Sequence, residues 1–246
     1  MKLSSWSISD IGLTRKSNQD FVGRFPDLNL FLVADGMGGH ADGEVASRMA
    51  VDVIHAFVKD AVTGPPCHSD VDCLRRAVEL ANQRIHEEGT RKVQQPPVRS
   101  LGTTVVALKL APETRQASWV HVGDSRLYRV RNGRLALLTA DHTLYGQEYL
   151  NTGPIPTDLP HTNKLVQALG ISELVEVTTG VDTMSAGDLF LLCSDGVSGQ
   201  LGAEAIEREL TATDDLRAVG QALIRLSLEA GGRDNASAVL VRVLED

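Results

Sequence analysis

Hydrophobic and polar positions repeat with two different periods along the chain, and the change of period predicts its elements. Near the N-terminus, Trp6 and Ile8 alternate with serines, and residues 31–34 form a continuous apolar run; both patterns are typical of strands. From Ala41 the apolar positions recur at helical spacing, which predicts an amphipathic helix. The stripe of this helix consists of Val45, Met49, Val53 and Phe57.

A second helix is predicted after a chain break at residues 63–66. Its apolar positions are Val71, Leu74, Val78, Ala81 and Ile85. We expect this helix to end at Gly89, because glycine commonly terminates helices, and we expect a loop at residues 94–97.

The remaining chain is dominated by strand patterns. Residues 103–110 and 117–130 are rich in β-branched and apolar side chains, and Asn132-Gly133 predicts a tight hairpin turn. Residues 141–164 contain three prolines and little periodicity, which indicates a surface flap. Further strands are predicted at 174–177, 188–194 and 236–244, with helices at 204–210 and 216–228. Helices grouped between runs of hairpin-connected strands favour an α+β fold with antiparallel sheets.

Length and charge narrow the class of protein. The 246 residues are predicted to form one domain, 1–246, and the net charge of −8 argues against nucleic-acid binding. No apolar stretch approaches membrane-spanning length, and no signal-peptide h-region is present, so we expect a cytoplasmic protein that does not bind membranes. Three cysteines are expected to be free thiols there, although Cys67 and Cys73 could pair.

Four aspartates share one local setting, at the ends of predicted strands next to glycine or a turn. They are Asp35, Asp124, Asp195 and Asp234. Any one of them alone is most simply read as a turn former or a helix cap. Four together suggest that their carboxylates converge on a hard cation, with the neighbouring glycine carbonyl as a further ligand. Oxygen ligands without a His/Cys cluster favour magnesium, manganese or calcium over zinc.

Six short motifs follow one another in a recognisable order. They are Arg15–Asp20 (RKSNQD), Asp35–His40 (DGMGGH), Gly102–Thr104 (GTT), Gly123–Arg126 (GDSR), Ser194–Val197 (SDGV) and Asp234-Asn235. This ordered set resembles the metal-dependent PP2C-type (PPM) serine/threonine phosphatases, and DGMGGH is the form found in their bacterial branch. The resemblance spans nearly the whole chain. It implies a PP2C-like four-layer α-β-β-α sandwich, in which helices flank two antiparallel sheets.

The resemblance also implies a centre with two Mn²⁺ or Mg²⁺ ions. In that reading Asp35 bridges both ions, Asp195 and Asp234 complete one of them, and the Gly36 carbonyl serves the other. Asp20 holds the water shell of the second ion.

Two further roles are implied by the same resemblance. Arg15 would bind the substrate phosphate through its fork of donors, and Asp124 together with Asp195 would hold a third, weaker ion. The simpler alternatives are that Arg15 is a surface cation and that Asp124 only caps the turn before Ser125.

The general acid is left open by the sequence. Animal relatives carry a histidine directly after the Asp-Gly pair, whereas Met37 stands there in this chain and the nearest histidine is His40. His40 is therefore a candidate acid, and a residue that merely fixes the entry to the helix is an equal alternative.

The implied function is hydrolysis of phosphoserine and phosphothreonine in proteins by direct attack of a metal-activated water. The expected partners are a phosphorylated protein substrate and an opposing bacterial Ser/Thr kinase with its targets, and the enzyme is expected to be a monomer. Two alternatives stay open: a domain that only recognises phosphoproteins, and a phosphatase of small phosphoesters.

Overall fold

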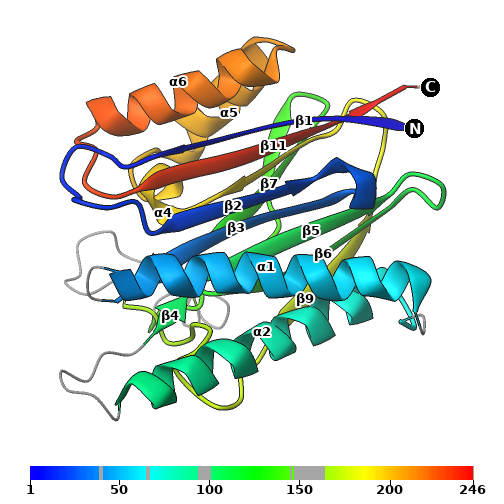
Figure 1. Ribbon diagram of the computed structural model, residues 1–246. Coiled ribbons are helices and arrows are strands. Elements are labelled where there is room, and N and C mark those ends of the chain that lie inside the picture. Colours follow the sequence, from blue (N-terminus) through cyan, green and yellow to red (C-terminus); the bar gives the residue numbers. More distant parts are fainter. Residues whose placement is uncertain (39–40, 65–66, 94–100, 145, 147–163, 246) are drawn as a thin grey trace.

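The computed structural model shows four layers, in the order helices, sheet, sheet, helices (Figure 1). It describes residues 1–38, 41–64, 67–93, 101–144, 146 and 164–245. Helices α1 (Ala41–Thr63) and α2 (Asp70–Val93) form one outer layer, and α5 (Ala203–Ala212) and α6 (Leu216–Glu229) form the other. The predicted four-layer α+β sandwich is confirmed.

Both sheets are antiparallel. The first contains, in spatial order, β1 (Lys2–Asp10), β11 (Ala236–Leu244), β10 (Leu189–Cys193), β7 (Arg126–Arg131) and β8 (Arg134–Leu137). The second contains β2 (Asp20–Phe25), β3 (Leu30–Met37), β5 (Val105–Ala111), β6 (Gln116–Val122) and β9 (Thr178–Thr183), and the short β4 (Gly102–Thr103) also pairs with β3. A 3₁₀ helix covers Pro26–Leu28, and the four-residue helix α4 covers Asp195–Ser198.

The strands are continuously apolar because each central strand is buried on both faces. In β3, Leu30 and Leu32 pack in the cluster beneath α1 and α2, whereas Phe31 and Val33 pack between the sheets. The same alternation divides β11 between the cluster under α5 and α6 and the cluster between the sheets. Each fully buried large apolar side chain contributes roughly 1.5–3 kcal/mol to folding through the hydrophobic effect.

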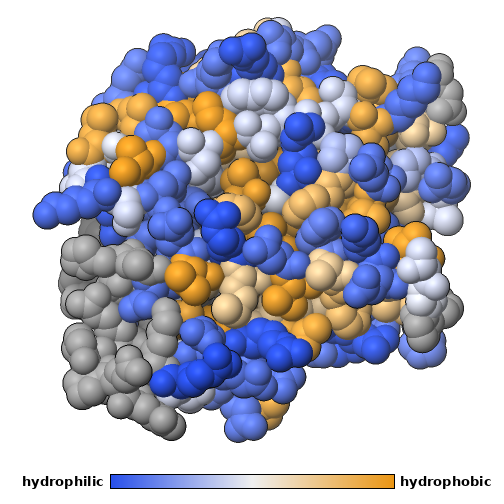
Figure 2. Space-filling model, in the orientation of Figure 1, coloured by the Kyte–Doolittle hydropathy of each residue, from blue (hydrophilic) through white to orange (hydrophobic). Residues whose placement is uncertain are grey.

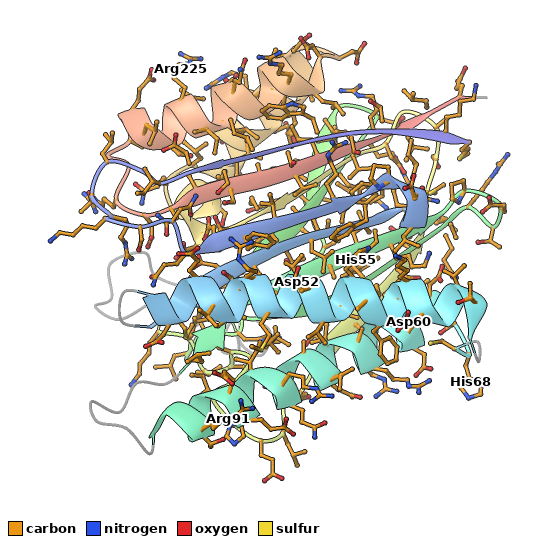
Figure 3. All side chains as sticks on the ribbon, viewed as in Figure 1. Asp52, His55, Asp60, His68, Arg91 and Arg225 are labelled. Atoms are coloured by element: carbon orange, nitrogen blue, oxygen red, sulfur yellow. The ribbon has the colours of Figure 1, made fainter. Side chains whose placement is uncertain are left out.

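The outer helices turn their polar faces to solvent. Figure 3 shows Asp52, His55 and Asp60 along α1, Arg91 on α2 and Arg225 on α6. His55 also stacks on Phe25 of β2, with ring centroids 3.8 Å apart. Apolar surface is visible between charged side chains on the face that α1 forms (Figure 2), as its amphipathic pattern predicts. Among the described residues, no helix is long and apolar enough to cross a membrane.

Several predictions of single elements were wrong. The strand expected at 174–177 lies instead at Thr178–Thr183, because the β-branched threonines pair with β6 while Leu174 is 87% exposed. Helix α2 continues past Gly89 to Val93, since Gly89 is buried and helical packing outweighs its weak helix propensity.

Strand β2 and helix α4 were not predicted, because neither has a clean apolar period. The Asn132-Gly133 turn is confirmed, and both residues have positive φ, as a type I′ hairpin requires. The loop expected at 94–97 and most of the flap expected at 141–164 lie outside the described residues. The described cysteines are free thiols, as predicted.

Candidate metal centre and phosphate site

One end of the sandwich carries an acidic cavity of about 230 Å³. It lies where α4, β4 and the start of α1 meet, on the left of Figure 1. Its wall consists of Arg15, Gln19, Asp35, Gly36, Met37, Gly38, Thr104, Asp124, Leu165, Asp195 and Asp234. Six of the eight predicted site residues therefore lie on one cavity. Of the other two, Asp20 is not a wall residue but is the strand partner of Asp35, and His40 lies outside the described residues.

Asp35 and Asp20 face each other across neighbouring strands. They are direct partners in the antiparallel register of β2 and β3, an arrangement in which two like charges destabilise a sheet. The backbone of Asp35 is fixed by Thr104, whose N–H donates to the Asp35 carbonyl at 2.8 Å and whose Oγ1 accepts from the Asp35 N–H at 3.1 Å. Burial raises the pKa of Asp35 well above its usual value, and the charges of Asp20 and Asp195 add to this.

Only one carboxylate oxygen of Asp20 has a hydrogen-bond partner in the described structure. Ser194 Oγ donates to Asp20 Oδ2 at 2.7 Å, whereas Asp20 Oδ1 is buried with no hydrogen-bond partner in the described structure. Burial raises the pKa of Asp20 to about 6. A buried carboxylate oxygen without a partner is costly, which makes it a ready acceptor for a cation or its water.

Gly36 occupies a position that admits no side chain. A Cβ there would lie 2.1 Å from the Gly43 carbonyl oxygen and 2.6 Å from that of Gln19. The Gly36 N–H donates to the Gln19 carbonyl at 3.1 Å, so the strand carrying Asp35 packs closely against the loop before β2. The glycine after Asp35 therefore permits the close backbone approach that a carbonyl ligand requires.

Asp195 is the first residue of the short helix α4, and Asp234 lies in the loop before β11; these two segments pack directly on each other. A Cβ on Gly196 would lie 1.8 Å from the Asn235 carbonyl oxygen. Asp195 Oδ1 is buried without a partner among the described residues, and the pKa of Asp195 is raised by burial and by the charge of Asp234.

Asn235 joins this part of the site to the N-terminal segment. Its Oδ1 accepts from the Gln19 N–H at 2.8 Å, and its Nδ2 donates to the carbonyls of Ile11 and Ser17 at 2.8 and 3.1 Å. The side chain of Asn235 thus fixes the segment that contains Arg15 and leads into Asp20.

Asp124 lies in the turn between β6 and β7. It is 9% exposed, and burial raises its pKa to about 7, with a further contribution from the charge of Asp195. The adjoining Ser125 hydroxyl bonds the Thr104 hydroxyl at 2.7 Å, which links this turn to the backbone of Asp35.

Arg15 is paired with one of the predicted metal ligands. Its Nη2 donates to Asp234 Oδ2 at 2.5 Å, and the two side chains are 49% and 29% exposed. In the described part of the chain, no three carboxylate, imidazole or thiolate groups already surround one point as ligands would.

The donor set nevertheless suits a hard divalent cation. Five carboxylates, those of Asp20, Asp35, Asp124, Asp195 and Asp234, gather around the cavity, and among its described wall residues only Arg15 is cationic. Two of these carboxylates have buried oxygens without partners, and burial raises the pKa of four. All-oxygen donors with excess negative charge are what Mg²⁺ and Mn²⁺ bind.

Some wall residues had no predicted role. Gln19 and Thr104 lie within the RKSNQD and GTT motifs, so their positions were visible in the sequence although their function was not. Met37 and Gly38 follow Asp35 in DGMGGH. Leu165 belongs to no motif and could be found only from the fold.

Comparison with known proteins agrees with this geometry. The sequence profile of the family described as protein phosphatase 2C matches residues 14–245. A putative protein phosphatase 2C-type from Streptococcus pyogenes is 34% identical over 241 residues, covering 95% of this chain and 94% of that protein.

Two solved structures extend the comparison to the fold. PppA, described as a key regulatory component of T6SS in Pseudomonas aeruginosa, is 33% identical with a TM-score of 0.85, and the match covers 98% of both chains. The catalytic domain of the serine/threonine protein phosphatase PstP, solved with two manganese ions, is 33% identical with a TM-score of 0.83, and the match covers 99% of both chains. The chain therefore belongs to the protein phosphatase 2C family of metal-dependent serine/threonine protein phosphatases.

Proposed function

We propose that the acidic cavity hydrolyses phosphoserine and phosphothreonine in proteins, with divalent cations held by its carboxylates. The observation that carries this proposal is the convergence of five carboxylates, two of them with buried unpartnered oxygens, beside one arginine. Such a charge distribution is unfavourable by itself and is suited to binding cations, which in turn can bind a phosphate dianion.

The proposed ligands follow the positions of the side chains. Asp35 lies at the centre and would contact both ions of a two-ion site, with Asp195 and Asp234 on one ion and the Gly36 carbonyl on the other. Asp20 would orient the water shell of the second ion through its free Oδ1. When bound, the cations would neutralise the phosphate and lower the pKa of an attacking water.

Arg15 has a separate task in this proposal. Its guanidinium is half exposed and presents a fork of donors that matches two phosphate oxygens. Its Nη2 donates to Asp234, so binding of cations by Asp234 would free that donor for a phosphate oxygen. Asp124 and Asp195 would hold a third, weaker ion.

The proposed substrate is a phosphoprotein, and the proposed partners are a Ser/Thr kinase and its targets. This is supported by the relatives named serine/threonine protein phosphatases, among them one from Mycobacterium tuberculosis. We further propose that residues 1–246 act as one monomeric domain in the cytoplasm, where the free thiols are stable.

The test is turnover of a phosphothreonine peptide with Mn²⁺, with Mg²⁺ and with EDTA. We expect activity with either ion and none with EDTA. The same assay on small phosphorylated metabolites separates a protein phosphatase from a phosphatase of small phosphoesters. Metal-independent turnover would overturn the cation proposal, and binding of the peptide without turnover would indicate a recognition domain.

A further inference from the structure

The turn that carries Asp124 is held at both ends by two consecutive residues of another segment. At one end, Arg126 forms a bidentate pair with Asp141, from Nε to Oδ1 at 2.8 Å and from Nη2 to Oδ2 at 2.6 Å. At the other end, Gly123 is bonded to His142. Asp124 and Ser125 lie between these two attachments.

His142 binds both backbone groups of Gly123. The His142 N–H donates to the Gly123 carbonyl at 2.9 Å, and the Gly123 N–H donates to His142 Nδ1 at 3.2 Å. Because Nδ1 accepts, the ring proton is on Nε2, which lies 2.9 Å from Thr178 Oγ1 and donates to it. Gly123 has a φ of +105°, so the residue before Asp124 is in a conformation that the surrounding structure must maintain.

The environment keeps this imidazole neutral. Burial lowers the pKa of His142 to about 4, and the neighbouring His121 ring, whose centroid is 4.5 Å away, acts in the same direction. Asp141 opposes this shift only partly. His121 itself is fixed through Nε2 to the Ala140 carbonyl at 2.8 Å. An acceptor is therefore available to Gly123 at neutral pH.

The same residue is also connected to another wall residue of the cavity, Leu165. The Val166 N–H donates to the His142 carbonyl at 2.8 Å, and Thr143 forms a β-bridge with Leu165. Leu165 lines the acidic cavity, although it is far in sequence from the strand that bears Asp35. His142 thus connects the Asp124 turn to a wall residue that no motif identifies.

We propose that His142 is a positioning residue, which holds Asp124 in place for the weakest divalent cation and sets the position of Leu165 at the same time. This inference rests on the proposed role of Asp124 as a cation ligand. The simpler alternative is that His142 only contributes packing, in which case its loss would affect stability alone.

Two polar substitutions distinguish these readings. His142→Asn keeps an acceptor at the place of Nδ1, within reach of the Gly123 N–H, whereas His142→Gln moves the amide toward the place of Nε2. Both are uncharged and similar in size, so their stabilities should be comparable. His142→Leu removes both ring hydrogen bonds, and Leu240→Ala in the distant cluster under α6 serves as the control for lost stability.

The measurement is Mn²⁺ binding to the purified full chain by isothermal titration calorimetry, with kcat and KM for a phosphothreonine peptide as a second readout. We expect His142→Gln and His142→Leu to weaken the weakest Mn²⁺ site by about 10-fold or more, as loss of groups supporting a ligand does. His142→Asn should stay near wild type, and the tighter sites should be unchanged in all three.

Each other outcome is decisive. If His142→Gln binds Mn²⁺ like wild type at every site, the positioning role is overturned, whatever happens to stability. If Leu240→Ala weakens the weakest Mn²⁺ site equally, the effect of the His142 variants is explained by lost stability, and the positioning role is likewise overturned. Asp124→Ala tests the assumption that Asp124 is a cation ligand. If that variant keeps the weakest Mn²⁺ site, the assumption is wrong. If its activity still requires Mn²⁺, the phosphatase proposal stays intact.

Discussion

The space between the two sheets and the acidic end of the same sandwich bury different kinds of side chain: apolar ones between the sheets and carboxylates at the acidic end. Between the sheets, Phe31, Val33, Phe190 and Leu192 are buried in one apolar cluster. Two residues beyond Val33, the same strand reaches Asp35, which is surrounded by other carboxylates. Strand β3 therefore runs from a region whose burial stabilises the fold into a region whose buried carboxylates destabilise it.

The contrast shows how the molecule divides stability from function. Apolar side chains between the sheets need no partner, whereas buried oxygens of Asp20 and Asp195 have none in the described structure. The rigid strands and the Thr104 and Asn235 hydrogen bonds keep these carboxylates close despite their repulsion. Changes at the acidic end should therefore affect turnover, and changes between the sheets should affect unfolding.

Asp35→Asn is the sharpest test of that division. We expect turnover of a phosphothreonine peptide to fall by about 10³-fold or more, because the proposed central ligand of the cations is lost. The free energy of unfolding of the metal-free protein should stay the same or rise, since the pKa of Asp35 is already raised and one source of repulsion disappears. Turnover like that of wild type at saturating Mn²⁺ would contradict the two-ion site.

Phe190→Ala tests the other region. The ring is fully buried between the sheets, so its loss should lower the free energy of unfolding by about 3–5 kcal/mol. At a temperature where the variant is folded, kcat per folded molecule and the Mn²⁺ concentration for half-maximal activity should match wild type. A shifted metal requirement would show that the two regions are not separate.

These two regions also differed in how far the sequence predicted them. The apolar runs predicted the central strands, and the helical stripe from Val45 to Phe57 predicted α1, because burial imposes a regular period. Strand β2 was not predicted because Gly23 and Arg24 interrupt its alternation of apolar and polar residues. The edge strand β9 escaped because exposed threonines and a glycine replace an apolar period.

The candidate site was predicted through its motifs rather than through any period. The motifs identified Asp35, Asp124, Asp195 and Asp234, and the fold brought them to one cavity. The pairing of Arg15 with Asp234 could not be predicted, because it joins residues 219 positions apart through loop geometry. Leu165 was missed for the same reason: its place depends on the bridge to Thr143.

His40→Ala asks whether the acidic end also supplies a proton. A serine or threonine alkoxide leaves with difficulty unless it is protonated, whereas a nitrophenolate leaves unaided. If His40 is the general acid, the variant should lose about 10²-fold in turnover of a phosphothreonine peptide but almost none with p-nitrophenyl phosphate. An equal loss on both substrates would point to a disturbed cation site, and no loss on either would exclude His40 as the acid.

The smallest expected effect concerns the cost of burying a single carboxylate, and Asp124→Asn measures it. The pKa of Asp124 is raised by burial from 3.8 to about 7 in the folded protein, so between these values the folded state binds more protons than the unfolded state. The stabilisation from this protonation is fully present below about pH 4 and is lost as the pH rises through 7.

Asparagine does not titrate, so the metal-free variant should gain stability over wild type between pH 5 and pH 8, by about 2 kcal/mol in the free energy of unfolding. Urea unfolding of both proteins with EDTA measures this difference. Repeating it with saturating Mn²⁺ should reverse the sign at pH 8 if ionised Asp124 holds a cation as proposed, because asparagine would hold that cation less well. A difference independent of pH would mean that Asp124 is not a buried charge, and a sign that Mn²⁺ leaves unchanged would mean that it holds no cation.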